Sequence, residues 1–119
     1  MKLTQLNDLA VEAVSHNPAI QKRVMLRWGD IPHLTNFSQA CFAPGQVAPA
    51  HAHTDMCEVF FVESGYGTIR INGQVYPMEP GSCIAIEPLE EHEITNNGST
   101  DLILTYFGLR VEPPLGDRT

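Results

Sequence analysis

The segment HAHTDMCE, residues 51–58, contains side chains of the types that hold metal ions in proteins. His51 and His53 are separated by one residue, and Glu58 follows five positions after His53. Residues two positions apart on a strand point to the same face, so both imidazoles can enter one interior. Imidazole nitrogens and carboxylate oxygens are ligands of divalent transition metals. The spacing therefore indicates a candidate chelating site.

Glu58 needs a break in the strand to join the two histidines. It lies an odd number of residues after His53, so an unbroken strand would direct it to the opposite face. We expect a bend or bulge at Thr54-Asp55, because these residue types favour turns. Glu58 would then be a charge among inward apolar neighbours in EVFFV, and a buried carboxylate is costly unless it is paired or bound to metal. The alternative interpretation leaves Glu58 at a solvent-exposed strand start and both histidines at the surface.

The rest of the chain predicts strands that could position these residues. From residue 19 onward, short runs rich in Val, Ile, Phe, Tyr and Thr are separated by turn signals. In TIRINGQVYPM, Ile69 and Ile71 alternate with polar residues, and Asn72-Gly73 suits a two-residue hairpin turn. This pattern predicts an all-β antiparallel sandwich or barrel.

The two ends of the chain differ from this pattern. Residues 5–16 are expected to form one short amphipathic helix within a helical arm at residues 1–18, with Asn17-Pro18 as the stop signal. His16 would lie in the last turn of this helix, in contact with the helix dipole rather than with a metal. Residues 112–119 are expected to form a loose C-terminal tail. The helix over residues 5–16 is predicted from five apolar residues that recur at helical spacing: Leu6, Leu9, Ala10, Ala13 and Val14.

Composition excludes several classes of protein. A chain of 119 residues suits one domain, and 14 acidic against 7 basic residues argue against a nucleic-acid partner. No apolar stretch approaches membrane-spanning length, which predicts a cytoplasmic protein without a membrane partner. The cysteines lack any C-x-x-C pairing and lie in apolar runs, which predicts buried free thiols at Cys41, Cys57 and Cys83.

Residues 45–65 resemble the first signature of the cupin superfamily, and residues 81–96 are similar to the second. In the first, the glycines at both ends and the His, His and Glu between them fall at the family spacing. In the second, the glycine and His92 do so. Glu87 and Leu89 replace the proline and second glycine of the family pattern, so the family pattern does not predict the conformation of this local turn.

The resemblance implies a small jelly-roll β-barrel over residues 19–111 that holds one divalent transition metal at its mouth. Three imidazoles and one carboxylate suit Fe, Mn, Ni, Cu or Zn better than Ca or Mg. Open coordination positions would remain for water, substrate or dioxygen. Carried over residue by residue, the metal ligands are His51, His53, Glu58 and His92.

The implied function is that of an enzyme acting on a small oxygen-bearing metabolite, of the dioxygenase, isomerase or decarboxylase type. The alternative is a non-catalytic, metal-dependent module that binds or senses a metabolite. No catalytic residue can be assigned, because the tyrosines have no spacing signature. The apolar cavity wall is expected to contain Phe60 and Val62, with Ile69 and Ile71 as further candidates.

Two further expectations concern binding partners. Val59 and Phe61 should point outward on the strand that carries Glu58, and together with the helix they predict a homodimer. Strand parity leaves open which arginine could anchor a substrate carboxylate. The four candidates are Arg23, Arg27, Arg70 and Arg110.

Overall fold

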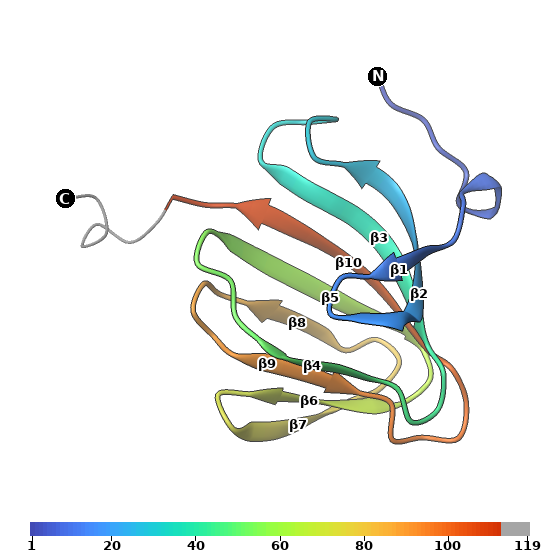
Figure 1. The fold of residues 1–119 in the computed structure, drawn as a ribbon, viewed down its shortest axis with the longest axis vertical. Helices are drawn as coiled ribbons and strands as arrows, with labels where there is room; N and C mark the ends of the chain where they lie inside the picture. The colour runs from blue at the N-terminus through green and yellow to red at the C-terminus, as the bar shows by residue number, and fades with distance from the viewer. Residues whose placement is uncertain (113–119) are drawn as a thin grey trace.

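The computed structural model describes residues 1–112, and its regular structure is almost entirely β-strand (Figure 1). The part of the chain that the structure describes has no helix long and apolar enough to cross a lipid bilayer. The elements in chain order are the 3-10 helix η1 (Leu6–Asp8), β1 (Glu12–Val14), β2 (Asn17–Arg27), β3 (Leu34–Phe42), β4 (Val47–His51), β5 (Met56–Ser64), β6 (Gly67–Ile71), β7 (Gln74–Met78), β8 (Cys83–Ile86), β9 (His92–Thr95) and β10 (Leu102–Arg110).

The strands form two antiparallel sheets that face each other (Figure 1). The larger sheet has the order β1-β2-β3-β10-β5-β8, and the smaller sheet has the order β4-β9-β6-β7. Strands that are far apart in sequence are neighbours in both sheets, as β10 is between β3 and β5. The predicted all-β jelly-roll barrel is confirmed.

The core lies between the two sheets and is built from their inward-facing residues. Ile20, Val62 and Leu104 come from the larger sheet, and Ile69 and Ile94 come from the smaller one. Burial alternates along β10, as expected for a strand with one face on the core. Each such side chain stabilises the fold by about 1.5 to 3 kcal/mol relative to an exposed one.

The hairpin predicted at Asn72-Gly73 is present between β6 and β7. Asn72 has φ 48° and Gly73 has φ 83°, and Ile71 pairs with Gln74 across the turn. Positive φ at both central residues is the requirement of a two-residue hairpin turn of this type, which Asn and Gly meet at low cost.

The predicted helix over residues 5–16 is wrong. Only η1 is helical, and β1 instead pairs with the edge of β2, where Val14 lies opposite Asn17. The segment is too short to be a stable helix by itself, and pairing with an available sheet edge satisfies its backbone hydrogen bonds. As a result, His16 is in the tight turn between β1 and β2 rather than in a helix.

Two other expectations concern the cysteines and the C-terminus. All three cysteines are free, as predicted, but the prediction that they are buried is wrong. Cys83 is exposed, and Cys41 and Cys57 are half-buried, because each alternates with inward-facing neighbours and so lies on the outer face of its sheet. The predicted tail, residues 112–119, lies outside the described residues except for its first residue.

Candidate metal centre

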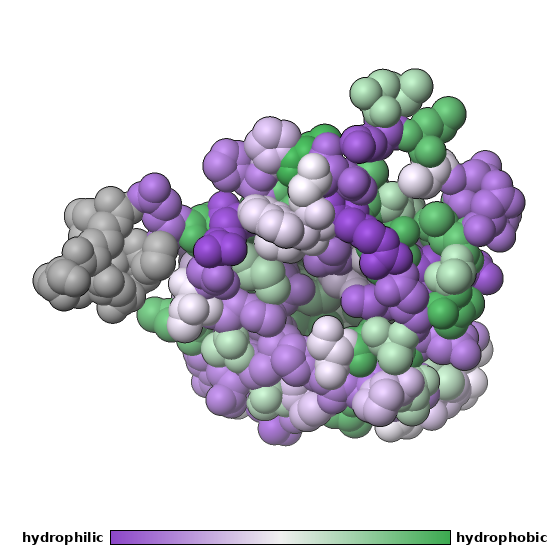
Figure 2. Space-filling model, turned by 45° about the horizontal axis from the view of Figure 1, so that its top comes forward, coloured by the Kyte–Doolittle hydropathy of each residue, from purple (hydrophilic) through white to green (hydrophobic). Residues whose placement is uncertain are grey.

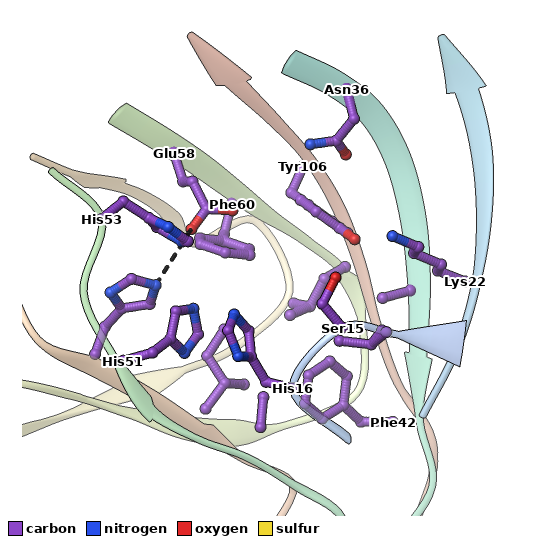
Figure 3. Close-up of a pocket in the computed structure, with 16 residues that line it drawn as sticks. Ser15, His16, Lys22, Asn36, Phe42, His51, His53, Glu58, Phe60 and Tyr106 are labelled. Carbon is purple, nitrogen blue, oxygen red and sulfur yellow. Dashed lines mark hydrogen bonds and ion pairs between the residues drawn. The ribbon is translucent and has the colours of Figure 1, made fainter. Parts of the chain in front are cut away.

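The structure brings together the four residues that the sequence selected. His51 ends β4 and lies directly opposite His92, the first residue of β9. His53 follows β4 in the connecting segment, and Glu58 reaches the same point from β5 of the larger sheet. Figure 3 shows the labelled side chains of His51, His53 and Glu58 directed toward one another at one end of a pocket.

The bend predicted before Glu58 is present. The chain leaves β4 after His51, bends at Thr54 and Asp55, and begins β5 at Met56. The bend changes the parity of the strand, so Glu58 faces inward and is only 7% exposed. The alternative interpretation, with Glu58 at a solvent-exposed strand start, is therefore wrong.

The ligand-type atoms of the four residues are close enough to surround one ion. One nitrogen or carboxylate oxygen from each residue lies within 4.8 Å of those of the other three. Glu58 Oε1 is 3.0 Å from His53 Nε2 and 3.2 Å from His92 Nε2. The same carboxylate oxygen therefore contacts both imidazoles.

Backbone carbonyls orient two of the imidazole rings. His51 Nδ1 lies 2.8 Å from the carbonyl oxygen of Pro49, and His92 Nδ1 lies 3.0 Å from that of Glu90. A carbonyl can only accept a hydrogen bond, so each Nδ1 carries the proton and each neutral ring has its lone pair on Nε2. The second ring nitrogen of a metal-binding histidine commonly makes such a contact. Backbone carbonyls leave no sequence signal, so sequence analysis could not identify them.

The chemistry of this donor set fits a cation. The lone pair on His92 Nε2 faces Glu58 Oε1 at 3.2 Å, and an ionised carboxylate oxygen is also an acceptor. Two acceptors at this distance need a proton or a metal ion between them. A transition metal would satisfy all four residues at once, whereas a proton satisfies one pair.

The electrostatic environment holds the carboxylate in its ionised form. Burial opposes ionisation of Glu58, but when a proton rather than a metal ion lies between Glu58 and His92, the resulting hydrogen bond and the nearby imidazoles outweigh burial and hold the pKa of Glu58 below its usual range. Burial lowers the pKa of His51, which favours the neutral imidazole that a metal requires. For His92, burial is outweighed by the contacts with Glu58 and the Glu90 carbonyl, so its pKa is raised.

A cavity of about 120 Å³ lies beside the four residues. Phe60 is in its wall as predicted, and Phe42, Ala40 and Leu104 add further apolar surface. Figure 2 shows a hollow in this face of the molecule with hydrophobic residues at its base. The expectation that Val62, Ile69 and Ile71 line the cavity is wrong. Val62 and Ile69 are fully buried in the core, and Ile71 packs against the core.

Several polar residues of the cavity were missed by sequence analysis. His16 stacks on His51 with 3.7 Å between ring centroids, although it was expected to lie in a helix. Lys22 shares the inward face of β2 with Ile20 and Val24, an alternation that could have identified it. The polar lining residues outside the four candidate ligands are Ser15, His16, Lys22, Asn36 and Tyr106.

None of the four candidate arginines is among the cavity-lining residues. Three of them form ion pairs near the surface, with Glu12, Glu93 and Asp55 as partners of Arg27, Arg70 and Arg110, respectively. Arg23 lies on the outer face of β2, next to a different groove. Among the described residues that line this cavity, Lys22 is the one lysine or arginine.

Comparisons with known proteins agree with this fold. An oxalate-binding protein of Thermotoga maritima is 30% identical over 66 residues, which cover 56% of this chain and 54% of that protein. The chain thus spans about half the length of this relative.

Solved structures share the whole fold at lower identity. A predicted oxalate decarboxylase of Thermotoga maritima has a TM-score of 0.85 and 20% identity, and the match covers 92% of this chain and 99% of that chain. A polyketide cyclase of Streptomyces resistomycificus has a TM-score of 0.77 and 19% identity, with 96% of this chain and 82% of that chain covered. At these identities the likeness concerns the fold alone.

The family assignment rests on a sequence match that includes the candidate metal ligands. The cupin domain family matches residues 38–108, more than half of the 119-residue chain. This range contains both signature segments and all four candidate metal ligands. The chain therefore belongs to the cupin family.

Proposed function

We propose that this protein is an enzyme that binds one divalent transition metal through its three histidines and Glu58 and acts on a small oxygen-bearing metabolite. The observation that carries the proposal is the convergence of four ligand atoms within 4.8 Å at the end of a cavity. A bound Fe, Mn, Ni, Cu or Zn ion would supply Lewis-acid or redox chemistry to a chelating ligand. The reaction classes that fit are those of a dioxygenase, an isomerase or a decarboxylase.

A small carboxylate is the ligand that the surroundings favour. The cavity of about 120 Å³ limits the ligand to a small metabolite. Lys22 is a cation within the lining, which favours an anion. The relative that is 30% identical is named for oxalate binding, and oxalate is a small carboxylate.

The protein's own residues would bind and orient such a ligand. Phe60, Phe42 and Leu104 exclude water from one side, which strengthens polar contacts in the cavity. Burial raises the pKa of Tyr106 to about 12, so its hydroxyl keeps its proton at neutral pH. Tyr106 can therefore donate a hydrogen bond to a ligand oxygen but cannot act as a base there.

The second candidate function is a non-catalytic module that binds or senses a metabolite at the same site. The protonated state of Tyr106 favours this alternative, because it removes one candidate base from the cavity. The name of the relative, an oxalate-binding protein, also describes binding rather than turnover.

Metal analysis followed by a turnover screen tests the proposal. We expect about one metal per chain after incubation with Fe(II), Mn(II), Ni(II), Cu(II) or Zn(II), measured by elemental analysis. Iron-loaded and manganese-loaded protein should then consume a member of a panel of small carboxylates and diketones, followed as substrate loss and oxygen uptake. Protein that takes up none of the five metals would contradict the metal site. Micromolar binding without consumption would favour the binding module.

Two properties of the whole protein complete the proposal. We infer a homodimer, supported by the outward direction of Val59 and Phe61 on β5. We also infer a cytoplasmic location, supported by three cysteines that are all free, since the cytosol keeps thiols reduced.

A further inference from the structure

Lys22 occupies an unusual position for a charged residue. On β2 it lies between Ile20, which is fully buried, and Val24, which is nearly so, and it shares their inward face. Lysine is rarely placed toward a protein interior unless its ammonium group has a partner. The side chain of Lys22 is half-buried, and it is one of the residues that line the cavity.

The acidic residue nearest to Lys22 in the sheet is already paired. Glu12 is directly opposite Lys22 across β1 and β2, but its carboxylate forms a bidentate ion pair with Arg27. Among the residues that the structure describes, no hydrogen bond or ion pair to the Lys22 ammonium group is found, and Glu12 affects it only as a nearby charge. Lys22 therefore presents an unpaired positive charge to the cavity.

The cavity has a second polar end, opposite the candidate metal ligands. Figure 3 shows the amino end of Lys22 pointing into the pocket on the side away from His51, His53 and Glu58, and near Tyr106 and Ser15. The apolar wall containing Phe60 and Leu104 also lines this cavity. A molecule in the cavity would meet the metal ligands at one end and a cation at the other.

We propose that Lys22 is the anchor for a second anionic group of the ligand. The ligand class is a dicarboxylate in which one end is a 2-hydroxy or 2-oxo acid that chelates the metal, while the distal carboxylate binds Lys22. This inference rests on the proposed function, because it needs a ligand held at the metal. Ser15 and the Tyr106 hydroxyl provide further polar contacts at the same end.

The sheet geometry sets the length of this ligand. In the larger sheet β3 and β10 separate β2, which carries Lys22, from β5, which carries Glu58. At the usual strand spacing, the backbones of β2 and β5 are roughly 14 Å apart. The side chains of Lys22 and Glu58 reach into this gap from its two sides and shorten it. Oxalate, whose two carboxylates are bonded directly to each other, is the shortest dicarboxylate, so a ligand with a carbon chain between its two anionic groups is better suited to reach both ends.

The test compares two ligands that differ only at the distal end. The compounds 2-hydroxypentanoate and 2-hydroxyglutarate present the same 2-hydroxy acid to the metal, and they end in a methyl group and a carboxylate, respectively. We expect protein loaded with the metal that it retains to bind 2-hydroxyglutarate about tenfold or more tightly, measured by isothermal titration calorimetry.

Substitutions at Lys22 should remove this preference in a charge-dependent way. Lys22→Met keeps the apolar stem and should reduce the affinity ratio to about one while metal content is retained. Lys22→Arg keeps the charge and should retain a preference for the dicarboxylate. The matched control is Arg70→Met, which removes one positive charge from an exposed position of β6 and should leave the ratio unchanged.

The outcomes separate the two proposals. A ratio near one in the wild-type protein, or a preference that persists in Lys22→Met, would overturn the anchor and leave the proposed function intact. If neither hydroxy acid nor oxalate binds the metal-loaded protein, the proposed function fails, and the role of Lys22 fails with it.

Discussion

His92 is held on both sides of its ring and is only 1% exposed. One nitrogen contacts the Glu90 carbonyl, and the other faces Glu58. These two contacts fix the ring of His92 in the buried part of the site. We expect His92→Ala to lower the metal content of the purified protein by about tenfold or more, measured by elemental analysis.

The control for this variant is His33→Ala, which removes an exposed histidine that does not line the cavity. It should retain the metal content of the wild type. Unchanged metal content in His92→Ala would contradict the assignment of the ligands, and equal losses in both variants would indicate a nonspecific effect.

The raised pKa of Tyr106 predicts that the stability of the fold depends on pH in the alkaline range. Burial raises its pKa to about 12, so ionisation is harder in the folded protein than in the unfolded chain. The contribution of this pKa shift to the free energy of unfolding is fully present below the unfolded-state pKa of about 10. It is lost as the pH rises through the folded-state pKa of about 12. A tyrosinate absorbance titration should show a component near pH 12 that is missing in Tyr106→Phe. A wild-type titration without this component would contradict the burial of Tyr106.

Tight turns position the elements that carry the site. Gly45, Gly65 and Gly81 belong to the two signature segments, and all have φ between 84° and 90°, where residues with a side chain are strained. Leu89 replaces a family glycine and has φ 72°, so the turn is retained despite the substitution. Its N–H donates a hydrogen bond to the carbonyl of His53, at 2.7 Å, which stabilises the turn beside a candidate ligand.

Gly65 should be the most sensitive of these turn positions. A Cβ at Gly65 would lie 2.1 Å from the carbonyl oxygen of Asp101, in addition to the strain of its φ of 84°. We expect Gly65→Ala to reduce the free energy of unfolding by about 2 to 4 kcal/mol, measured by chemical denaturation. Gly81→Ala is the matched control, since Gly81 has φ 90° and no atom near the added Cβ, so the loss should be about 1 kcal/mol. Equal losses in the two variants would contradict the role of the close contact.

Features that depend on local sequence were predictable, and features that depend on distant pairing were not. Alternation and turn residues identified the strands, the Asn72-Gly73 hairpin and the bend before Glu58. The pairing of β1 with β2 competes with an apparent helical pattern, and its outcome depends on the exposed edge of β2. The alternation of Lys22 with Ile20 and Val24 indicates that Lys22 points inward, but the cavity that Lys22 shares with Tyr106 follows from sheet order, which no local signal specifies.

At the scale of the molecule, the outer face of the larger sheet predicts self-association. Phe61 on β5 is 40% exposed, and Val59 lies beside it on the same face. Covering such residues is favourable by about 25 cal/mol per Å² of buried apolar area. We expect sedimentation at micromolar concentration to show a dimer of the 13.2 kDa chain and Phe61→Asp to shift it toward monomer. A single species of 13.2 kDa in the wild-type protein would contradict the homodimer.

The four candidate ligands come from both sheets of the barrel. His51 and His92 belong to the smaller sheet and Glu58 to the larger one, with 34 positions of chain between Glu58 and His92. A bound ion would therefore be a cross-link between the two layers, in a protein whose cysteines are all free. Cross-links that close long loops restrict the unfolded chain and stabilise the folded one. Release of the ion and separation of the layers at the barrel mouth would then be coupled steps.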